Sequence, residues 1–311
     1  MALVQLLPYS TQSLYWSQNL QLNILREINN LIYKLKKGKE MKVQFKTDKP
    51  KLLDCYCCEG GAAKGYNDAG FEVVGIDIVD RVNYPYQFIK GDVLELLKDK
   101  ELVEQFDVIH ASPPCQHYSR LKYLNDDIEA WEKKHVDLIN PTRELLCKIG
   151  KPYVIENVVG APLICPIKLS GSQFKGMYTQ RPRLFESNVF IQRPIEPVKK
   201  LGTSRLGTIS ETGAVSICGR QPLQGLNEEQ TKLYYMIALG GDCQWMSLEG
   251  LTQCIPPCYT EFIGKQIIDS LYKPNEDYNN VQIEQYIREI LSSKEFLNMV
   301  VNYVKESEVI A

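Results

Sequence analysis

Long hydrophobic runs are missing from this chain. No stretch of about eighteen consecutive apolar residues occurs, which argues against a membrane-spanning helix. The first residues, MALVQLLPYSTQ, contain neither the basic leader nor the small-residue cleavage site of a secretory signal. We therefore expect a soluble, cytoplasmic protein with no membrane partner.

An excess of positive charge is also missing, since 36 Lys and Arg residues stand against 38 Asp and Glu residues. The net charge of -2 supplies no overall attraction to nucleic acid or to an anionic membrane. Any basic face must therefore be local. Three segments are candidates, with an ordinary solvated face as the alternative for each: 25–42, 180–185 and 196–207.

Cysteine is present, but ten residues in 311 are too few for a disulfide scaffold. Because Cys57 and Cys58 are adjacent, reduced thiols are the better expectation. A zinc site is the alternative. The tightest cysteine cluster, Cys55 with Cys57 and Cys58, falls inside a strand pattern. The other pair, Cys254 and Cys258, has no second pair and no histidine nearby to complete a zinc site. We predict no metal.

Short apolar runs alternate with helical segments over most of the first half of the chain. The runs are LLDCYC, EVVGIDI, YQFIK, FDVIHAS and PYVIENV. This alternation indicates a parallel sheet with helices on both faces, so we predict an α/β fold with a doubly wound, Rossmann-like sheet. Ligands bind outside the carboxyl ends of the strands in such sheets.

The pattern divides the chain into five parts, without an internal repeat or a low-complexity segment. Helical spacing over 19–38 precedes a basic linker, and residues between 186 and 245 are rich in Gly, Pro, Thr and Ser. The predicted parts are an N-terminal helical extension and linker (1–47), the main α/β domain (48–185), a small lobe (186–245), a helical segment (246–272) and a polar helical tail (273–311).

The first apolar run leads into a ligand-binding turn, DCYCCEGGAAKGYNDAG. We expect the strand to end at Tyr56, where Gly60 and Gly61 then allow a tight turn into a helix. The GxGxxG fingerprint and the P-loop lysine pattern are absent, which disfavours a triphosphate and a nicotinamide oxidoreductase. Asp77 ends the second strand, where a carboxylate can accept hydrogen bonds from ribose hydroxyls. Asp92 follows the third strand, where it can accept from an adenine amino group, cap the next helix, or do both. Together these features suit S-adenosylmethionine.

Cys115 follows the fourth strand in SPPCQHYS. A thiol at the carboxyl end of a strand, held by two prolines, is placed to act as a nucleophile, with an inert buried thiol as the alternative. Glu156 in PYVIENV is expected to end the next strand and to enter the same cleft. A buried carboxyl can stay protonated and donate to a ring nitrogen. A thiol with a carboxylic acid is the pair that activates a pyrimidine.

In order and spacing, these motifs resemble those of the DNA cytosine-5 methyltransferases, most closely the compact members carried by bacteriophages. The resemblance covers about residues 51–271 and includes NPTRELL, QRPRLF and LTQCIPPCYTEFIGKQI. It implies a catalytic S-adenosylmethionine-binding domain at 48–185, a small target-recognition region at 186–245, and a motif at 246–272 that returns to the catalytic domain. It also implies a bacterial or phage-infected host cytoplasm, a monomer, and a place in DNA methylation or restriction-modification.

The resemblance assigns roles residue by residue. Cys115 would add to C6 of a cytosine in double-stranded DNA, and Glu156 would contact N3 and the exocyclic amine. Arg183 would reach O2 and steer the glutamate, while Arg181 would serve the pocket or a phosphate. The implied cofactor-binding residues are Tyr56, Cys58, Glu59, Gly60, Gly61, Asp77, Ile78, Asp92, Val93, Pro114 and Gln253. The implied DNA-binding residues, beside the flipped-out base, are Gln116, Ser119, Arg120 and Lys122.

The chain departs from the family pattern at three places. Cys58 and Glu59 stand where the family commonly has glycine and a small or apolar residue, and Thr252 and Gln253 stand in place of Gly-Asn. The contacts to the methionine end of the cofactor, or the group that is transferred, can therefore differ from those of the family. The target-recognition region is short, which suggests a short DNA target. An RNA cytosine-5 methyltransferase and a catalytically inactive DNA-binding relative are the alternatives. The N-terminal extension is either a packing element or a basic arm for the DNA backbone.

Overall fold

The computed structural model describes residues 43, 45, 48–119, 127–194, 208–210, 213–217 and 222–272. The predicted helix at 19–38, the tail at 273–311, Arg120 and Lys122 lie outside these residues. The chain divides into two units, Met1–Val43 and Gln44–Ala311, and every element below belongs to the second unit.

A seven-stranded mixed sheet forms the centre of this unit, with the strand order β3-β2-β1-β4-β5-β7-β6. Five neighbouring strands are parallel: β3 (Gln87–Lys90), β2 (Glu72–Asp77), β1 (Lys51–Cys55), β4 (Val108–Ala111) and β5 (Tyr153–Val158). Two further strands complete the sheet, because β7 (Arg183–Ser187) runs antiparallel to β5 and pairs with β6 (Ile167–Leu169).

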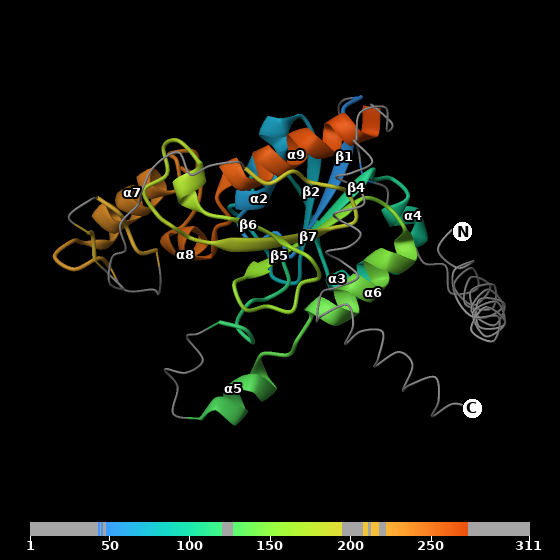
Figure 1. The fold of residues 1–311 in the computed structure, drawn as a ribbon. Coiled ribbons are helices and arrows are strands. Elements are labelled where there is room, and N and C mark those ends of the chain that lie inside the picture. The colour runs from blue at the N-terminus through green and yellow to red at the C-terminus, as the bar shows by residue number, and fades with distance from the viewer. Residues whose placement is uncertain are drawn as a thin grey trace. The chain divides into compact units, whose positions relative to one another are not determined.

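Helices cover both faces of the sheet (Figure 1). The strands predict this arrangement, because β1 and β4 are buried along nearly their whole length, which requires cover on both faces of the sheet. Helices α2 (Gly61–Ala69) and α9 (Pro257–Tyr272) lie on one side, and α3 (Val93–Leu96) and α6 (Ile139–Ile149) lie on the other. The predicted doubly wound α/β fold is confirmed.

Helices α2 and α9 pack in close contact because glycines face the contact from both sides. A Cβ atom on Gly65 would overlap the backbone of Pro257, and one on Gly264 would lie 2.8 Å from Cβ of Ala69. The Thr260 hydroxyl donates to the carbonyl oxygen of Ala62 at 2.9 Å and fixes the register of the two helices. The C-terminal helical segment is thereby fastened beside the turn that follows β1.

A buried ion pair fastens α6 to the antiparallel part of the sheet. Nε and Nη2 of Arg143 donate to the two carboxylate oxygens of Glu186, each at 2.8 Å. A buried charge is tolerated when its hydrogen bonds are satisfied. Glu186 also accepts from the backbone N–H of Ile164, and Arg143 donates to the carbonyl of Pro162. This network holds β7, and therefore Arg183 at its start, against β5.

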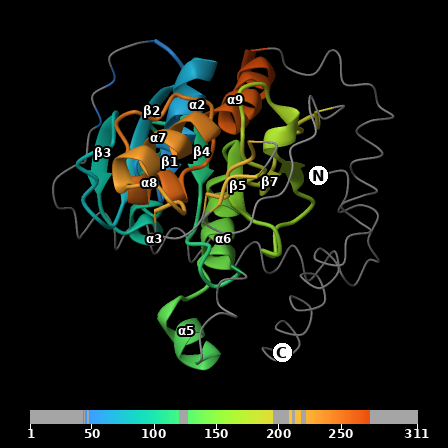
Figure 2. The same ribbon diagram turned by 90° about the vertical axis from the view of Figure 1, so that its left-hand side faces the viewer.

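A second apolar cluster includes residues of α7 (Glu228–Ala238) and α8 (Leu248–Gln253). These two helices lie in front of the sheet in the turned view of Figure 2. Both helices begin with a side-chain cap, from Asn227 and from Ser247. The cluster takes members from the predicted lobe and from the segment after it: Val215, Ile217, Leu223, Tyr235, Ala238, Leu239, Cys243, Met246, Leu251 and Cys254.

Two predicted strand ends shift by a few residues. β1 ends at Cys55, since Tyr56 has left-handed backbone geometry with φ 60°. Glu156 lies inside β5, is followed by two more strand residues, and pairs with Phe185 of β7. The remaining short elements are α4 (Lys100–Val103), α5 (Ile128–Lys134) and a 3-10 turn at Gly171–Gln173. Among the described helices, none is long and apolar enough to cross a membrane.

Candidate functional site

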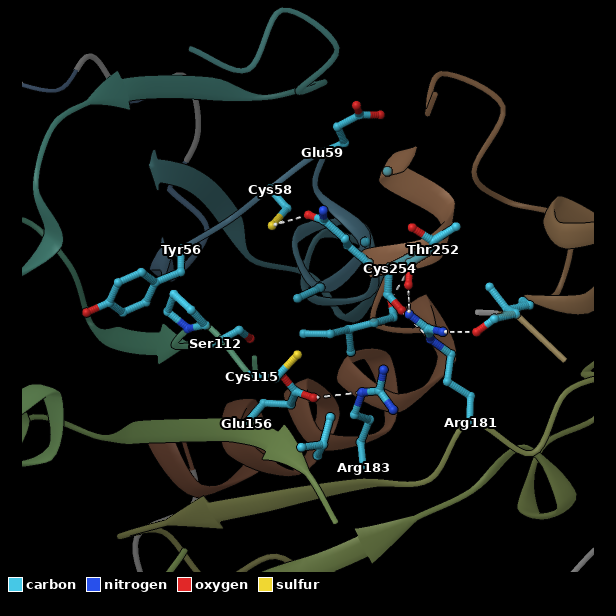
Figure 3. Close-up of a pocket in the computed structure, with 18 of the residues that line it drawn as sticks. Tyr56, Cys58, Glu59, Ser112, Cys115, Glu156, Arg181, Arg183, Thr252 and Cys254 are labelled. Atoms are coloured by element: carbon cyan, nitrogen blue, oxygen red, sulfur yellow. Dashed lines mark hydrogen bonds and ion pairs between the residues drawn. The ribbon is translucent and has the colours of Figure 1, made fainter. Parts of the chain in front are cut away.

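A cavity of about 830 Å³ lies at the carboxyl ends of the parallel strands (Figure 3). It brings together residues from the turn after β1, the end of β2, the segment after β4, β5, the start of β7 and α8. Fourteen predicted site residues line it: Tyr56, Cys58, Glu59, Gly61, Asp77, Ile78, Pro114, Cys115, Gln116, Ser119, Glu156, Arg181, Arg183 and Gln253. Gly60, Asp92 and Val93 do not line it.

The turn after β1 has an unusual backbone. Tyr56, Cys58 and Gly60 all have positive φ angles, of 60°, 47° and 86°. Such angles strain a residue with a side chain, so the surrounding contacts must hold the turn in place. The Tyr56 hydroxyl is fixed by a 2.8 Å hydrogen bond with Thr142 Oγ1 of α6. At Gly61 a Cβ atom would lie 2.5 Å from Sγ of Cys254 and 2.6 Å from the carbonyl oxygen of Ile255, so only glycine fits there.

Asp77 ends β2, and three neighbours bind its carboxylate. It accepts from the backbone N–H groups of Cys58 at 3.1 Å and Val79 at 3.0 Å, and it forms an ion pair with Arg81 Nε at 3.1 Å. Arg81 lines the same cavity and was not predicted from the sequence. It places a positive charge beside the predicted ribose site. Ile78 is 64% exposed and adds an apolar surface there.

Glu59 has a different environment from the one that its predicted cofactor role suggests. Its carboxylate accepts from the backbone N–H and the hydroxyl of Ser247, both at 2.7 Å, and its carbonyl oxygen accepts from Trp245 Nε1 at 2.7 Å. Gly250 makes room for it, because a Cβ atom there would overlap the carboxylate. The side chain points away from Cys115 in Figure 3. Glu59 therefore fastens the turn after β1 to the start of α8.

Asp92 caps α3, as one of its two predicted roles required. Its carboxylate accepts from the backbone N–H of Leu94 at 2.8 Å, and the side chain is exposed. Val93 is buried beside it. The role of both residues toward an adenine stays a prediction.

Asp54, which the sequence did not single out, is a buried acid in the lining of the cavity. Oδ2 accepts from the Tyr84 hydroxyl at 3.4 Å, whereas Oδ1 has no hydrogen-bond partner among the described residues. Burial raises the pKa of Asp54 to about 8, with a smaller contribution from Asp77 that is opposed by the Tyr84 hydrogen bond. The unpaired oxygen of Asp54 can accept a hydrogen bond from a cationic group of a ligand, and Asp77 can accept from the hydroxyls of a ribose. The cavity therefore fits a ligand that carries both a cation and a nucleoside.

The segment that carries Cys115 is held at two backbone points. The N–H of Ser112 donates to the carbonyl of Cys55 at 3.1 Å, and Nδ2 of Asn157 donates to the carbonyl of Pro113 at 2.9 Å. Burial raises the pKa of Cys115, and Arg183 and Arg181 oppose this shift while Glu156 adds to it. The thiol therefore needs the two arginines, or a base, to reach its nucleophilic form.

Glu156 and Arg183 form an ion pair beside the thiol, with Oε1 of the glutamate 3.1 Å from Nε of the arginine. Figure 3 places both side chains next to Cys115. Burial raises the pKa of Glu156, and Arg183, Ser112 and Arg181 lower it by smaller amounts. Because burial outweighs these contacts, the Glu156 carboxyl takes up a proton more readily than an exposed glutamate does.

Arg181 lines the cavity, but its donors are directed at the backbone. Nε, Nη1 and Nη2 donate to the carbonyls of Cys254, Ile217 and Thr252, at 2.6, 3.2 and 2.7 Å. Burial lowers the pKa of Arg181 to about 10. Arg181 therefore joins β7, α8 and the second apolar cluster. Its predicted role toward the pocket or a phosphate stays a prediction.

The residues after Cys115 contact α5. Trp131 Nε1 donates to the carbonyl of Gln116 at 3.1 Å, and Nδ1 of His117 lies 2.9 Å from the carbonyl of His135. Oε1 of Gln116 is buried and has no hydrogen-bond partner among the described residues. Trp131 lines the cavity and was not predicted, because a single tryptophan outside any motif gives no signal in the sequence.

Comparison with known proteins gives partial matches, and no family model matches this chain. The chain is 28% identical to the type II methyltransferase M.AgeI of Thalassovita gelatinovora over 124 residues, which covers 35% of this chain and 28% of that protein. It is 30% identical to the type II methyltransferase M.NgoPII of Neisseria gonorrhoeae over 118 residues, which covers 35% of this chain and 33% of that protein. The chain thus spans about a third or less of the length of these relatives.

Among solved structures, the chain is similar to a protein described as a DNA modification methyltransferase encoded within an E. coli prophage. The sequence identity is 14% and the TM-score is 0.47, over 72% of this chain and 100% of that chain.

Proposed function

We propose that this protein is a DNA methyltransferase that transfers a methyl group from S-adenosylmethionine to C5 of a cytosine. The observation that carries the proposal is the convergence of a thiol, a carboxyl and an arginine, Cys115, Glu156 and Arg183, in one cavity. The similarity to two type II methyltransferases supports the same class of reaction.

The residues of the chain divide the chemistry between them. The Cys115 thiolate forms a bond to C6 of the pyrimidine, and the electron pair of the C5–C6 double bond moves toward C5 and N3. Glu156, held by Arg183, donates a hydrogen bond or a proton at N3 and so stabilises the charge on the ring. After the methyl group is attached to C5, a base removes the C5 proton, the double bond re-forms, and the sulfur leaves C6 as a thiolate.

S-adenosylmethionine supplies the methyl group on a positively charged sulfur. Asp77 and the turn after β1 would hold its nucleoside, and the unpaired Oδ1 of Asp54 would accept from its ammonium group. Gly61 allows the turn to pack directly against Cys254 and Ile255, which brings the segment after α8 close to the cofactor site. Gln253 lines the same cavity from α8.

A cytosine within a duplex hides C5 and C6, so it must leave the helix to meet Cys115, at a cost of a few kcal/mol. Gln116 and Ser119, and Arg120 and Lys122 beyond the described residues, would contact the DNA backbone. Because phosphate contacts release counterions, we expect the affinity for duplex DNA to fall as salt is raised. An affinity that is independent of salt would contradict this part of the proposal.

The first test compares the wild type with Cys115→Ala on duplex DNA in the presence of S-adenosylmethionine. The DNA is digested to nucleosides and 5-methyldeoxycytidine is measured by mass spectrometry. We expect the product with the wild type and with Cys147→Ala, which replaces an exposed cysteine outside the cavity, and none with Cys115→Ala. Sequencing of the same DNA would give the target, which we expect to be short.

The same experiment with RNA in place of DNA distinguishes the two candidate substrates. Methylation of RNA but not of DNA would replace the proposed substrate while leaving the thiol chemistry in place. Binding of DNA by the wild type without any modified nucleoside would favour an inactive relative.

A further inference from the structure

His110 is the next-to-last residue of β4, the strand that leads to Cys115, and it is fully buried. The fold gives this histidine two hydrogen-bond partners. Nδ1 lies 3.0 Å from the hydroxyl of Tyr66, which comes from α2 and is also fully buried. Nε2 lies 2.8 Å from Oγ of Ser112, two residues further along the chain.

Ser112 continues this line of contacts to the candidate active site. It lines the cavity together with Cys115 and Glu156, and the Ser112 hydroxyl contributes to lowering the pKa of the Glu156 carboxyl. Three hydrogen-bonded side chains, Tyr66, His110 and Ser112, therefore connect α2, through β4, to the wall of the cavity that Glu156 also lines.

The direction of these hydrogen bonds follows from the Tyr66 hydroxyl. A phenol carries one proton, and among the described residues His110 Nδ1 is the partner of this hydroxyl. If Nδ1 carried a proton, the buried Tyr66 proton would have no acceptor, which costs free energy. Nδ1 must therefore be the acceptor, so Nε2 carries the proton and donates to Ser112.

The Ser112 hydroxyl then acts as an acceptor toward His110, so its own proton must be donated to a different group. Its oxygen accepts from Nε2 of His110, so its O–H remains available for another acceptor in the cavity, which Glu156 also lines. If the histidine had the opposite tautomer, Nε2 would be an acceptor and would compete with Glu156 for this proton. His110 is also kept neutral, because burial lowers its pKa to about 3.

We propose that Tyr66, His110 and Ser112 form a directional hydrogen-bond chain that fixes the Ser112 hydroxyl as a donor to Glu156 and so positions this carboxyl for the base. His110 and Tyr66 are positioning residues, since neither lines the cavity. The effect on methyl transfer rests on the proposed function, whereas the direction of the chain does not.

The direction can be measured without any reaction. The chain has three histidines, so a long-range proton–nitrogen NMR spectrum of the full-length protein with ¹⁵N-labelled histidine is readily assigned with single His→Gln variants. We expect neutral His110 with the proton on Nε2 at neutral pH. A proton on Nδ1, or a charged imidazolium, would overturn the proposal.

The positioning role is tested by a double-mutant cycle on single-turnover methyl transfer. Ser112→Ala removes the donor to Glu156, and we expect a loss of about tenfold in rate, with Tyr66→Phe giving a smaller loss. Because both changes act through the same proton, Tyr66→Phe should add nothing when Ser112 is already alanine. Tyr153→Phe is the matched control, since this buried tyrosine bonds to Cys147 outside the cavity, and its effect should be independent of Ser112.

Independent losses from Tyr66→Phe and Ser112→Ala would overturn the positioning role. If the wild type transfers no methyl group at all, the proposed function fails instead, and the NMR spectrum alone decides on the hydrogen-bond chain.

Discussion

Sγ of Cys58 lies 3.4 Å from Oε1 of Gln253, although the two residues are 195 positions apart. Both are positions at which this chain departs from the family that it resembles. Glu59, the neighbouring departure, bonds to Ser247 at the other end of α8. The unusual residues therefore contact α8 at two points, and they hold the turn after β1 against this helix.

Replacement of Gln253 should loosen this turn and weaken cofactor binding. We expect Gln253→Ala to raise the Kd for S-adenosylmethionine about fivefold, because one hydrogen bond of ordinary strength and one lining side chain are lost. Isothermal titration calorimetry on the full chain measures this change. The turnover rate at saturating cofactor should change much less.

The matched control is Gln244→Ala, which removes an exposed glutamine outside the cavity. If Gln253→Ala and Gln244→Ala bind the cofactor with equal affinity, the contact with Cys58 has no part in holding the ligand.

Replacement of Arg183 should act on the chemical step. Its guanidinium pairs with Glu156 at 3.1 Å and lowers the pKa of both Glu156 and Cys115. Without this charge, the thiolate is harder to form and the glutamate is less firmly placed. We expect Arg183→Ala to reduce the single-turnover rate about 100-fold or more, in line with the loss of one electrostatic contact to a transition state. Arg183→Lys keeps the charge but not the planar donor group, so it should recover part of the rate.

The readout is methyl transfer from radiolabelled S-adenosylmethionine to duplex DNA, with cofactor affinity measured in parallel. A loss of cofactor affinity with an unchanged single-turnover rate would place Arg183 in binding rather than in chemistry.

The sheet and the residues that line the candidate site could be predicted from the sequence because their signals are local. Alternating apolar runs and helical segments predict a parallel sheet, and a cysteine just after a strand must lie at its carboxyl edge. Cys115, Glu156 and Asp77 reach the cavity for this reason alone. Their chemical roles stay predictions, as do the domain boundaries.

Contacts between distant segments could not be predicted in this way. Glu59 meets Ser247 across 188 positions, and the donors of Arg181 meet carbonyls 36 to 73 positions away. Nothing in the residues around Glu59 or Arg181 distinguishes a structural contact from a ligand contact. Tyr66 was missed because its partner, His110, becomes a neighbour only when the sheet is assembled.

Replacement of Arg181 should act on stability. Its three donating nitrogens bond to backbone carbonyls on two other segments, and the side chain is buried. Arg181→Ala leaves these carbonyls unpaired and opens a cavity, so we expect the free energy of unfolding to fall by about 3 kcal/mol. Urea unfolding measures this change. Arg193→Ala, at an exposed arginine, is the control and should change stability by less than about 0.5 kcal/mol.

A stable Arg181→Ala variant that has lost methyl transfer would contradict this expectation and would favour the role toward the pocket or a phosphate that the family resemblance implies.

Asp54 should make the stability of the protein depend on pH. Its pKa is about 8 in the folded chain, against 3.8 for an unperturbed aspartate, because the carboxyl is buried. Between these two values the folded state binds a proton that the unfolded state has lost. The stabilisation is therefore complete at low pH and is lost as the pH rises through about 8.

Asp54→Asn keeps the shape of the side chain and cannot titrate. Relative to this variant, the wild type should lose up to about 1.4 kcal/mol of unfolding free energy per pH unit between about pH 5 and about pH 7. The comparison cancels the contributions of Glu156 and Cys115, which both proteins share. Asp80→Asn, at an exposed aspartate, is the matched control. Parallel stability curves for the wild type and Asp54→Asn would mean that the carboxyl is charged in the folded chain, and its Oδ1 would then need a cationic partner even without a ligand.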